Sequence, residues 1–263
     1  MIEARNVSFS VGKKELISDV SVSFAAAKLH LVIGPNGAGK STLIKLLSRL
    51  LRSSQGSVTY DGTDIGMSTE AELAKYRAVL SQAIDVAFPL TVREVVMMGR
   101  YPHFKGRPGS NDEQIVNDLM ELFEVTEFEH RNYQTLSGGE RQRVNFARVL
   151  AQLWLPESHP PVSDHRYLFL DEPLTFLDIN HQIAFMKTVR KFAGNTYVVT
   201  VGVVHDLNLA ARFADQIVLM DEGRVITVGT PAEVLTIDNI KHVFKVDPVM
   251  IDVDGSGMHM VFD

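Results

Sequence analysis

The chain has 263 residues, 45% of them hydrophobic and 22% charged, with a formal net charge of −6 at pH 7. This length allows one large domain, or one domain with a sub-lobe, built around a substantial core. The acidic balance argues against a broad nucleic-acid-binding surface, and the lack of cysteine excludes disulfides and thiolate metal sites.

The first residues lack the charged and apolar blocks of a signal peptide. The longest apolar run, residues 197–204, is far shorter than the ~20 residues that span a bilayer. We therefore expect a soluble chain whose role at a membrane comes through a partner.

The N-terminal part of the chain predicts antiparallel strands. Residues 2–33 alternate apolar and polar positions around a turn at Gly12, and a further strand pair is expected around residues 56–62. From about residue 69 to residue 155 the apolar spacing becomes helical. The residues that mark a buried helix face there are Ile115, Leu119, Leu122 and Phe123.

The rest of the chain alternates strands with helices. The expected strands are residues 167–170, 198–204 and 217–220, and the expected helices between them are residues 180–192 and 207–213. Such alternation predicts parallel βαβ units. Residues 249–253 and 258–262 predict a final hairpin. The fold expected is α/β, with an N-terminal antiparallel β part and a helical lobe inserted into the core.

The stretch from Gly34 to Thr42 fits G-x-x-x-x-G-K-[ST], the phosphate-binding P-loop, between an apolar run and an amphipathic run. Glycines let backbone N–H groups turn inward, and the helix start adds a partial positive charge. Lys40 would reach the β- and γ-phosphates of ATP, and the Ser41 hydroxyl would ligate Mg²⁺. The residues expected at the phosphates are Asn36, Gly37, Ala38, Gly39, Lys40, Ser41 and Thr42. The alternative is a glycine-rich turn before an ordinary helix.

Two carboxylates follow the apolar run 167–170. Asp171 suits the Mg²⁺ shell, directly or through a water, because ligands bind at strand C-termini in α/β folds. Glu172 is placed to polarise a water aimed at the γ-phosphate. The alternative is an acidic loop that merely ends a strand.

A second helix start with the character of an anion site lies at residues 136–140, Leu-Ser-Gly-Gly-Glu. Ser137 is the expected cap of a helix through residues 144–153. Two phosphate-binding helix starts leave two arrangements open, either both around one ATP in cis or two chains sharing two ATPs in trans. A plain capped helix is the third alternative.

The order of these motifs resembles that of the ATP-binding-cassette (ABC) transporter ATPases over nearly the whole chain. The features that carry the resemblance are the P-loop, Gln82, residues 136–140 with Gln142 and Arg143, Asp171 with Glu172, Asp178, and His205. The resemblance implies a single P-loop ATPase domain over residues 1–263. Its catalytic core with the β subdomain would comprise residues 1–82 and 160–263, and its helical subdomain residues 83–159.

The resemblance also implies roles at the ATP site. Gln82 would reach Mg²⁺ and sense the γ-phosphate, and His205 would contact the γ-phosphate. The implied catalytic residues are Glu172, His205, Lys40 and Gln82. Two copies would pack head to tail, so that one copy reaches the ATP on the other. The residues that would act across this dimer are Ser137, Gly138, Gly139, Glu140 and Asp178.

The chain departs from the family pattern in two places. Val11 stands where many members place an aromatic ring on adenine, and valine offers dispersion without ring stacking. We therefore expect ATP and GTP to compete within a modest factor. Residues 174–177 are bulkier than the usual small polar residues before the aspartate at Asp178.

Two segments point to a cargo. Residues 91–103 are similar to those of bacterial importers of iron chelates, haem and vitamin B12, and the extended loop 155–166 with residues 151–154 is similar to haem (hemin) importer ATPases. The resemblance implies haem import, with ferric-siderophore or cobalamin import as alternatives and a soluble non-transport ATPase as a further one.

The implied partners are a second copy of the chain, an integral membrane permease dimer and, through the complex, a periplasmic or surface substrate-binding protein. Nucleic acid is not among them. The implied location is the cytoplasmic face of the bacterial inner membrane, as a peripheral subunit.

Overall fold

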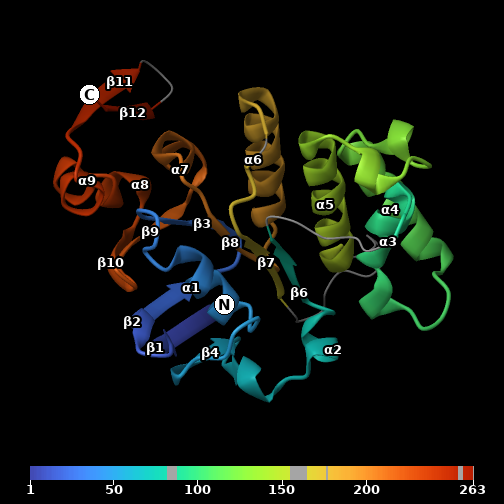
Figure 1. Ribbon diagram of the computed structural model, residues 1–263, viewed down its shortest axis with the longest axis horizontal. Helices are drawn as coiled ribbons and strands as arrows, with labels where there is room; N and C mark the ends of the chain where they lie inside the picture. The colour runs from blue at the N-terminus through green and yellow to red at the C-terminus, as the bar shows by residue number, and fades with distance from the viewer. Residues whose placement is uncertain (82–87, 155–164, 176, 254–256, 263) are drawn as a thin grey trace.

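The computed structural model describes residues 1–81, 88–154, 165–175, 177–253 and 257–262 (Figure 1). The strands of these residues form a four-stranded sheet, a six-stranded sheet and a two-stranded sheet. The α/β fold expected from the sequence, with its antiparallel N-terminal part, is confirmed.

The four-stranded sheet is antiparallel in the order β2-β1-β4-β5. Its strands are β1 Ile2–Val11, β2 Lys14–Phe24, β4 Gln55–Tyr60 and β5 Thr63–Asp64. Both strand pairs predicted in this part of the sequence are present. The β1–β2 turn contains Gly12 at φ +61°, in the left-handed region that glycine adopts readily.

The six-stranded sheet carries the core of the molecule, in the order β10-β9-β3-β8-β7-β6. Its strands are β3 Lys28–Ile33, β6 Arg77–Leu80, β7 Arg166–Leu170, β8 Val198–Val203, β9 Gln216–Asp221 and β10 Arg224–Gly229. All neighbours are parallel except β10, which pairs antiparallel with β9. Every residue of β8 is buried, as expected of a strand covered on both faces.

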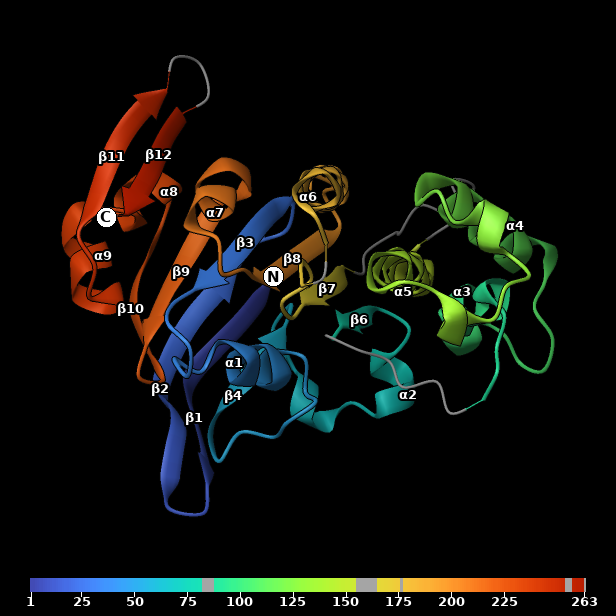
Figure 2. The ribbon, with the colours of Figure 1, turned by 45° about the horizontal axis from the view of Figure 1, so that its top comes forward.

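The helices lie on both faces of this sheet and at one end of it. They are α1 Lys40–Leu47, α2 Glu70–Leu73, α3 Val92–Met98, α4 Ser110–Leu122, α5 Gly138–Leu153, α6 Ile179–Ala193, α7 Leu207–Phe213, α8 Pro231–Val234 and α9 Ile237–Phe244. The 3₁₀ turns are η1 Ile65–Met67, η2 Tyr101–His103, η3 Thr126–Phe128 and η4 Tyr133–Thr135. Figure 2 shows α6 and α7 on one face, α1 with the antiparallel sheet on the other, and α3 to α5 grouped beyond β6.

Two hydrophobic cores result, one on each face of the six-stranded sheet. Leu168 and Leu170 of β7 pack into the core shared with α5, α6 and α7. Tyr167 and Phe169 of the same strand point to the core shared with α1 and the N-terminal sheet. Alternating side chains of one strand therefore join the two halves of the molecule.

Two expectations about the segment from residue 69 to residue 155 are wrong in detail. It contains the strand β6, where helical spacing was expected, because a four-residue edge strand is too short to show a period of two. Leu122 is 47% exposed rather than buried. The buried stripe of α4 runs from Ile115 to Met120, and Leu122 lies about a quarter turn from its centre.

The expected hairpin near the end of the chain is present as β11 Pro248–Val253 and β12 Gly257–Phe262. Asn208 of α7 holds it with a pair of hydrogen bonds. Its side-chain amide donates to Met260 O at 3.1 Å, and its Oδ1 accepts from Met260 N at 2.8 Å. The turn expected between the two strands covers residues 254–257, of which 254–256 lie outside the described residues and Gly257 begins β12.

Helices α3, α4 and α5 are tied together by backbone proximity and one buried ion pair. Arg100 Nε donates to Asp112 Oδ1 at 2.9 Å, and its guanidinium also donates to Ala151 O at 2.6 Å. Gly99, directly after α3, lies so close to α5 that a Cβ there would overlap Arg148 O.

We predict that Gly99→Ala lowers the free energy of unfolding by about 1–3 kcal/mol, the usual cost of overpacking a close contact. The matched control is Gly194→Ala. Both glycines follow a helix with ordinary right-handed dihedrals, but the nearest atom to a Cβ at Gly194 is 3.5 Å away. Denaturant unfolding of both variants checks this prediction, and equal stability of the two variants would contradict it.

Candidate functional site

Three sequence motifs meet at one edge of the six-stranded sheet. Gly34 follows β3, Asp171 follows β7, and His205 comes two residues after β8. Strands β3, β8 and β7 are parallel neighbours in that order, so their carboxyl ends lie side by side. This edge is where open α/β sheets bind ligands.

The P-loop has the backbone that its glycines predict. Gly37 and Gly39 have φ of +82° and +95°, and Gly39 directly precedes α1. Asn36 and Gly37 are exposed, whereas Ala38 is buried. A Cβ on Gly37 would meet no atom within 4 Å, so the loop faces open space at that point.

Lys40 lies inside this loop. Its Nζ donates to Gly34 O at 2.8 Å and to Pro35 O at 2.9 Å. Burial lowers the pKa of Lys40, and the nearby carboxylates of Glu172 and Asp171 oppose that shift. The ammonium is thus held at the start of α1 by two carbonyls that an anionic ligand can replace.

Asp171 is buried and only partly hydrogen-bonded. The Ser41 hydroxyl donates to its carboxyl group. Its Oδ1 is buried and has no hydrogen-bond partner among the described residues. Burial raises the pKa of Asp171, and the Ser41 hydrogen bond opposes that shift. A hydroxyl beside an unsatisfied carboxylate oxygen fits the oxygen ligands that Mg²⁺ requires.

Glu172 is held in an unusual conformation facing His205. Its φ of +52° lies in the left-handed region, which costs free energy for a residue with a Cβ. Its Oε1 lies 2.9 Å from Nε2 of His205. The Thr175 hydroxyl donates to Glu172 O at 3.1 Å and closes the turn.

The second helix start is capped as the sequence predicts. Ser137 N donates to Glu140 Oε2 at 2.6 Å, and Glu140 N donates to Ser137 Oγ at 3.3 Å. The hydrogen bond from the Ser137 backbone lowers the pKa of Glu140. Ser137 and Gly138 are exposed, so their side of the helix start is open to a ligand.

This helix start does not reach the P-loop of its own chain. Both views place α5 on the far side of β6 and β7 from α1 (Figures 1 and 2). Instead α5 is attached to the segment after Glu172, where Gln142 Nε2 donates to Pro173 O at 2.6 Å. This position of α5 disfavours the cis arrangement, and the trans arrangement stays a prediction.

The remaining predicted residues include some that the structure describes and some that lie outside the described residues. Asp178 caps α6 by accepting from His181 N at 2.9 Å. Val11 ends β1 and is 60% exposed, whereas Phe9 packs against the core. Gln82, the loop at residues 155–164 and the residue at position 176 lie outside the described residues, so the roles expected of them stay predictions.

Sequence reasoning missed the structural roles of Gln142 and Gly223. Gln142 is a buried polar residue on a helix whose buried side is mainly apolar, and that position was its available signal. Gly223 lies in the two-residue turn between β9 and β10, and its main-chain N–H donates to Ala38 O at 3.1 Å. This turn was missed because β10 was not predicted.

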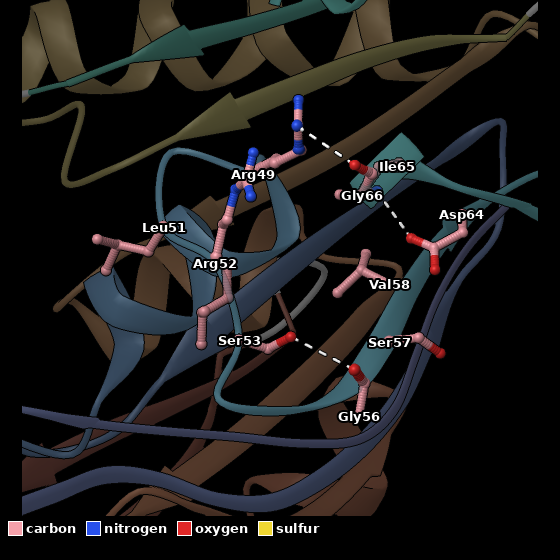
Figure 3. Close-up of a pocket in the computed structure, with 11 residues that line it drawn as sticks. Arg49, Leu51, Arg52, Ser53, Gly56, Ser57, Val58, Asp64, Ile65 and Gly66 are labelled. Atoms are coloured by element: carbon pink, nitrogen blue, oxygen red, sulfur yellow. Dashed lines mark hydrogen bonds between the residues drawn. The ribbon is translucent and has the colours of Figure 1, made fainter. Parts of the chain in front are cut away.

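A cavity of about 210 Å³ lies at the opposite end of α1 from Lys40. Figure 3 shows Arg49 and Arg52 beside it, and the main-chain N–H of Gly66 donates a hydrogen bond to Asp64 Oδ1. None of its lining residues belongs to the edge of the sheet where the motifs meet. We therefore place the candidate site at that edge and not in this cavity.

The buried charge of Asp171 predicts a stabilising substitution. A carboxyl whose pKa is higher in the folded state binds its proton more tightly when folded, so stability falls as pH rises past the ordinary carboxyl range. We predict that Asp171→Asn raises the Tm of the nucleotide-free protein at neutral pH by about 2–4 °C. Calorimetry across pH 4–8 checks this. The gain should shrink toward acid pH, and an unchanged or lower Tm at neutral pH would contradict the prediction.

Comparison with known proteins identifies the family. The ABC transporter family matches residues 17–175. The hemin import ATP-binding protein HmuV of Bradyrhizobium diazoefficiens is 43% identical, with 97% of this chain and 92% of that protein covered. The protein of the same name from Escherichia coli O157:H7 is 41% identical, with 90% and 89% covered.

Solved structures agree on the fold. A protein described as a metal-chelate type ABC transporter, in an inward-facing conformation, matches with a TM-score of 0.81 at 23% identity over 100% of this chain and 96% of that one. A dimeric ATP-binding cassette in a post-hydrolysis state with ADP and Pi matches with a TM-score of 0.75 at 23% identity, over 88% and 99%.

Within the part of the chain that the structure describes, no helix has both the length and the hydropathy that crossing a membrane requires. The family match covers more than half of the chain, and the curated relatives are 41–43% identical over at least nine-tenths of it. The chain therefore belongs to the ABC transporter family, as one of its ATP-binding subunits.

Proposed function

We propose that this chain is the ATP-hydrolysing subunit of a hemin importer. The observation that carries the chemistry is the meeting of Lys40, Asp171 and the Glu172–His205 pair at three adjacent strand ends. The cargo is supported by relatives named hemin import ATP-binding proteins at 41–43% identity.

The phosphates of ATP would lie on the backbone N–H groups of residues 36–42, with the base beside Val11. Lys40 would exchange its two carbonyl partners for phosphate oxygens, a stronger interaction because both groups are charged. The ligand thereby compensates for the burial of the ammonium.

Ser41 and Asp171 would hold Mg²⁺, with Gln82 as a third group expected from the resemblance. The hydroxyl next to an unsatisfied carboxylate oxygen supports this assignment. The ion would neutralise charge on the phosphate oxygens.

Glu172 would act as general base and accept a proton from the attacking water. His205, at 2.9 Å, would orient Glu172 and contact the γ-phosphate. Phosphoryl transfer requires mainly positioning and charge stabilisation from the protein, and both residues closely follow buried strands.

The site would be completed by a second copy packed head to tail. Helix α5 lies across β6 and β7 from α1 of its own chain, and this supports a contact of residues 137–140, at the start of α5, with ATP on a partner. Asp178 would act at the same interface. Closure on ATP and opening after hydrolysis is the two-state element that would drive the permease.

The complex would further contain an integral membrane permease dimer and a periplasmic or surface substrate-binding protein. The chain would lie at the cytoplasmic face of the inner membrane. Its core and β subdomain would comprise residues 1–82 and 160–263, and its helical subdomain residues 83–159.

The cargo is tested by reconstituting the chain with candidate permeases and binding proteins in liposomes. We predict hemin uptake that requires ATP and hemin-stimulated ATP hydrolysis. Parallel liposomes receive a ferric siderophore or cobalamin. If a ferric siderophore or cobalamin, but not hemin, is taken up and stimulates ATP hydrolysis, the hemin assignment is wrong. The assignment of the chain as a transport ATPase would not be affected.

We predict that Glu172→Gln keeps ATP binding but lowers turnover by roughly two to four orders of magnitude, the usual contribution of a general base. The matched control is Glu124→Gln, because Glu124 has the same φ of +52° and lies exposed after α4. Steady-state hydrolysis and nucleotide binding check both variants. Turnover near the wild-type rate in Glu172→Gln would refute the assignment of the base.

A further inference from the structure

The turn between β9 and β10 contacts the P-loop, although the two segments are far apart in the sequence. Gly223 N donates to Ala38 O at 3.1 Å, and Gly223 O accepts from Ser18 N at 2.9 Å. Gly223 is therefore hydrogen-bonded to the P-loop through its N–H and to strand β2 through its carbonyl.

The contact is too close for side chains. A Cβ on Gly223 would lie 2.7 Å from Leu16 O. A Cβ on Gly39 would lie 2.8 Å from the same oxygen, 2.9 Å from Ile17 Cδ1 and 3.4 Å from Gly223 Cα. Both glycines are also in the left-handed region, at φ +77° and +95°. Three backbone segments are thus packed directly against one another.

The same hairpin also holds the first residue of the loop. A Cβ on Gly34 would overlap Met220 O, which belongs to the end of β9. Both ends of the loop, at Gly34 and at Ala38–Gly39, therefore rest on the β9–β10 hairpin.

We propose that Gly223 is a positioning residue of the ATP site, which fixes the backbone of Ala38 and Gly39 so that the N–H groups at the start of α1 face the phosphates. The proposal rests on the proposed binding of ATP at the P-loop. Backbone donors have no rotamers with which to adjust, so their direction depends on what the backbone packs against. Gly223 would act through its hydrogen bond to Ala38 and not through a contact with the nucleotide.

The test compares Gly223→Ala with Gly62→Ala. Gly62, in the β4–β5 turn, has φ +81°, and a Cβ there meets nothing within 4 Å. Both variants carry the backbone cost of a left-handed alanine, but only Gly223→Ala pushes a methyl group against β2 beside the P-loop. Binding is measured by fluorescence titration with mant-ATP, and hydrolysis is measured across ATP concentrations.

We expect Gly223→Ala to raise the Kd for mant-ATP and the KM for ATP about tenfold or more, equivalent to one lost charged hydrogen bond. The kcat at saturating ATP should change less than KM. Gly62→Ala should bind like wild type. The rise in Tm on adding ATP should also be smaller in Gly223→Ala, which a loss of stability alone does not produce.

A milder pair keeps the test valid if Gly223→Ala does not fold. Ile17→Val removes the methyl group that lies against Gly39, and Ile2→Val removes one from the same core cluster in β1. Both isoleucines are fully buried. We expect Ile17→Val to raise the Kd for mant-ATP about threefold more than Ile2→Val, through loosening of the loop backbone.

Equal Kd values within each pair would overturn the proposal. A wild-type protein that does not bind mant-ATP would instead refute the proposed function, so the two failures are distinguishable. Weaker binding in Gly223→Ala and Ile17→Val, with both controls like wild type, supports the positioning role.

Discussion

The candidate site depends on the hydrogen bonds that hold β3, β8 and β7 side by side. Gly202 of β8 pairs with Leu31 of β3 on one side and with Leu170 of β7 on the other. This register places the three strand ends within two residues of one another along the sheet. A slip of one residue would move an end by about 3.3 Å and turn its side chains to the other face. The sheet register therefore brings the segments of the candidate site together, and the turns that follow the strands complete it.

Local chemistry made much of this arrangement predictable. The P-loop glycines, the Ser137 cap and the carboxylates after β7 each carry a signal within a few residues, and the alternating strands and helices indicate a parallel sheet. Contacts between distant segments carry no such signal. The strand β6 is too short for periodicity, and the bond from Gln142 to Pro173 exists only once α5 has packed beside β7. The residues alone also left the cis and trans arrangements open, and the trans arrangement was expected only from the family resemblance.

The bond between Gln142 and Pro173 joins the two halves of the proposed composite site within one chain. The helix that begins at Ser137 is attached directly to the turn that holds Glu172. In a head-to-tail dimer, the start of α5 would contact a partner's nucleotide while Glu172 faces the chain's own. Binding of one nucleotide would then change the affinity of the dimer for the other. Because such coupling is reciprocal, the second nucleotide would change the affinity for the first by the same factor.

The unsatisfied oxygen of Asp171 and the desolvated ammonium of Lys40 each cost the folded chain stability. A ligand that satisfies these groups binds the folded chain and not the unfolded one. By mass action it adds about 2.7 kcal/mol of stability at a concentration one hundred times its Kd. A bound nucleotide would therefore also protect the subunit from proteases that cleave its unfolded form.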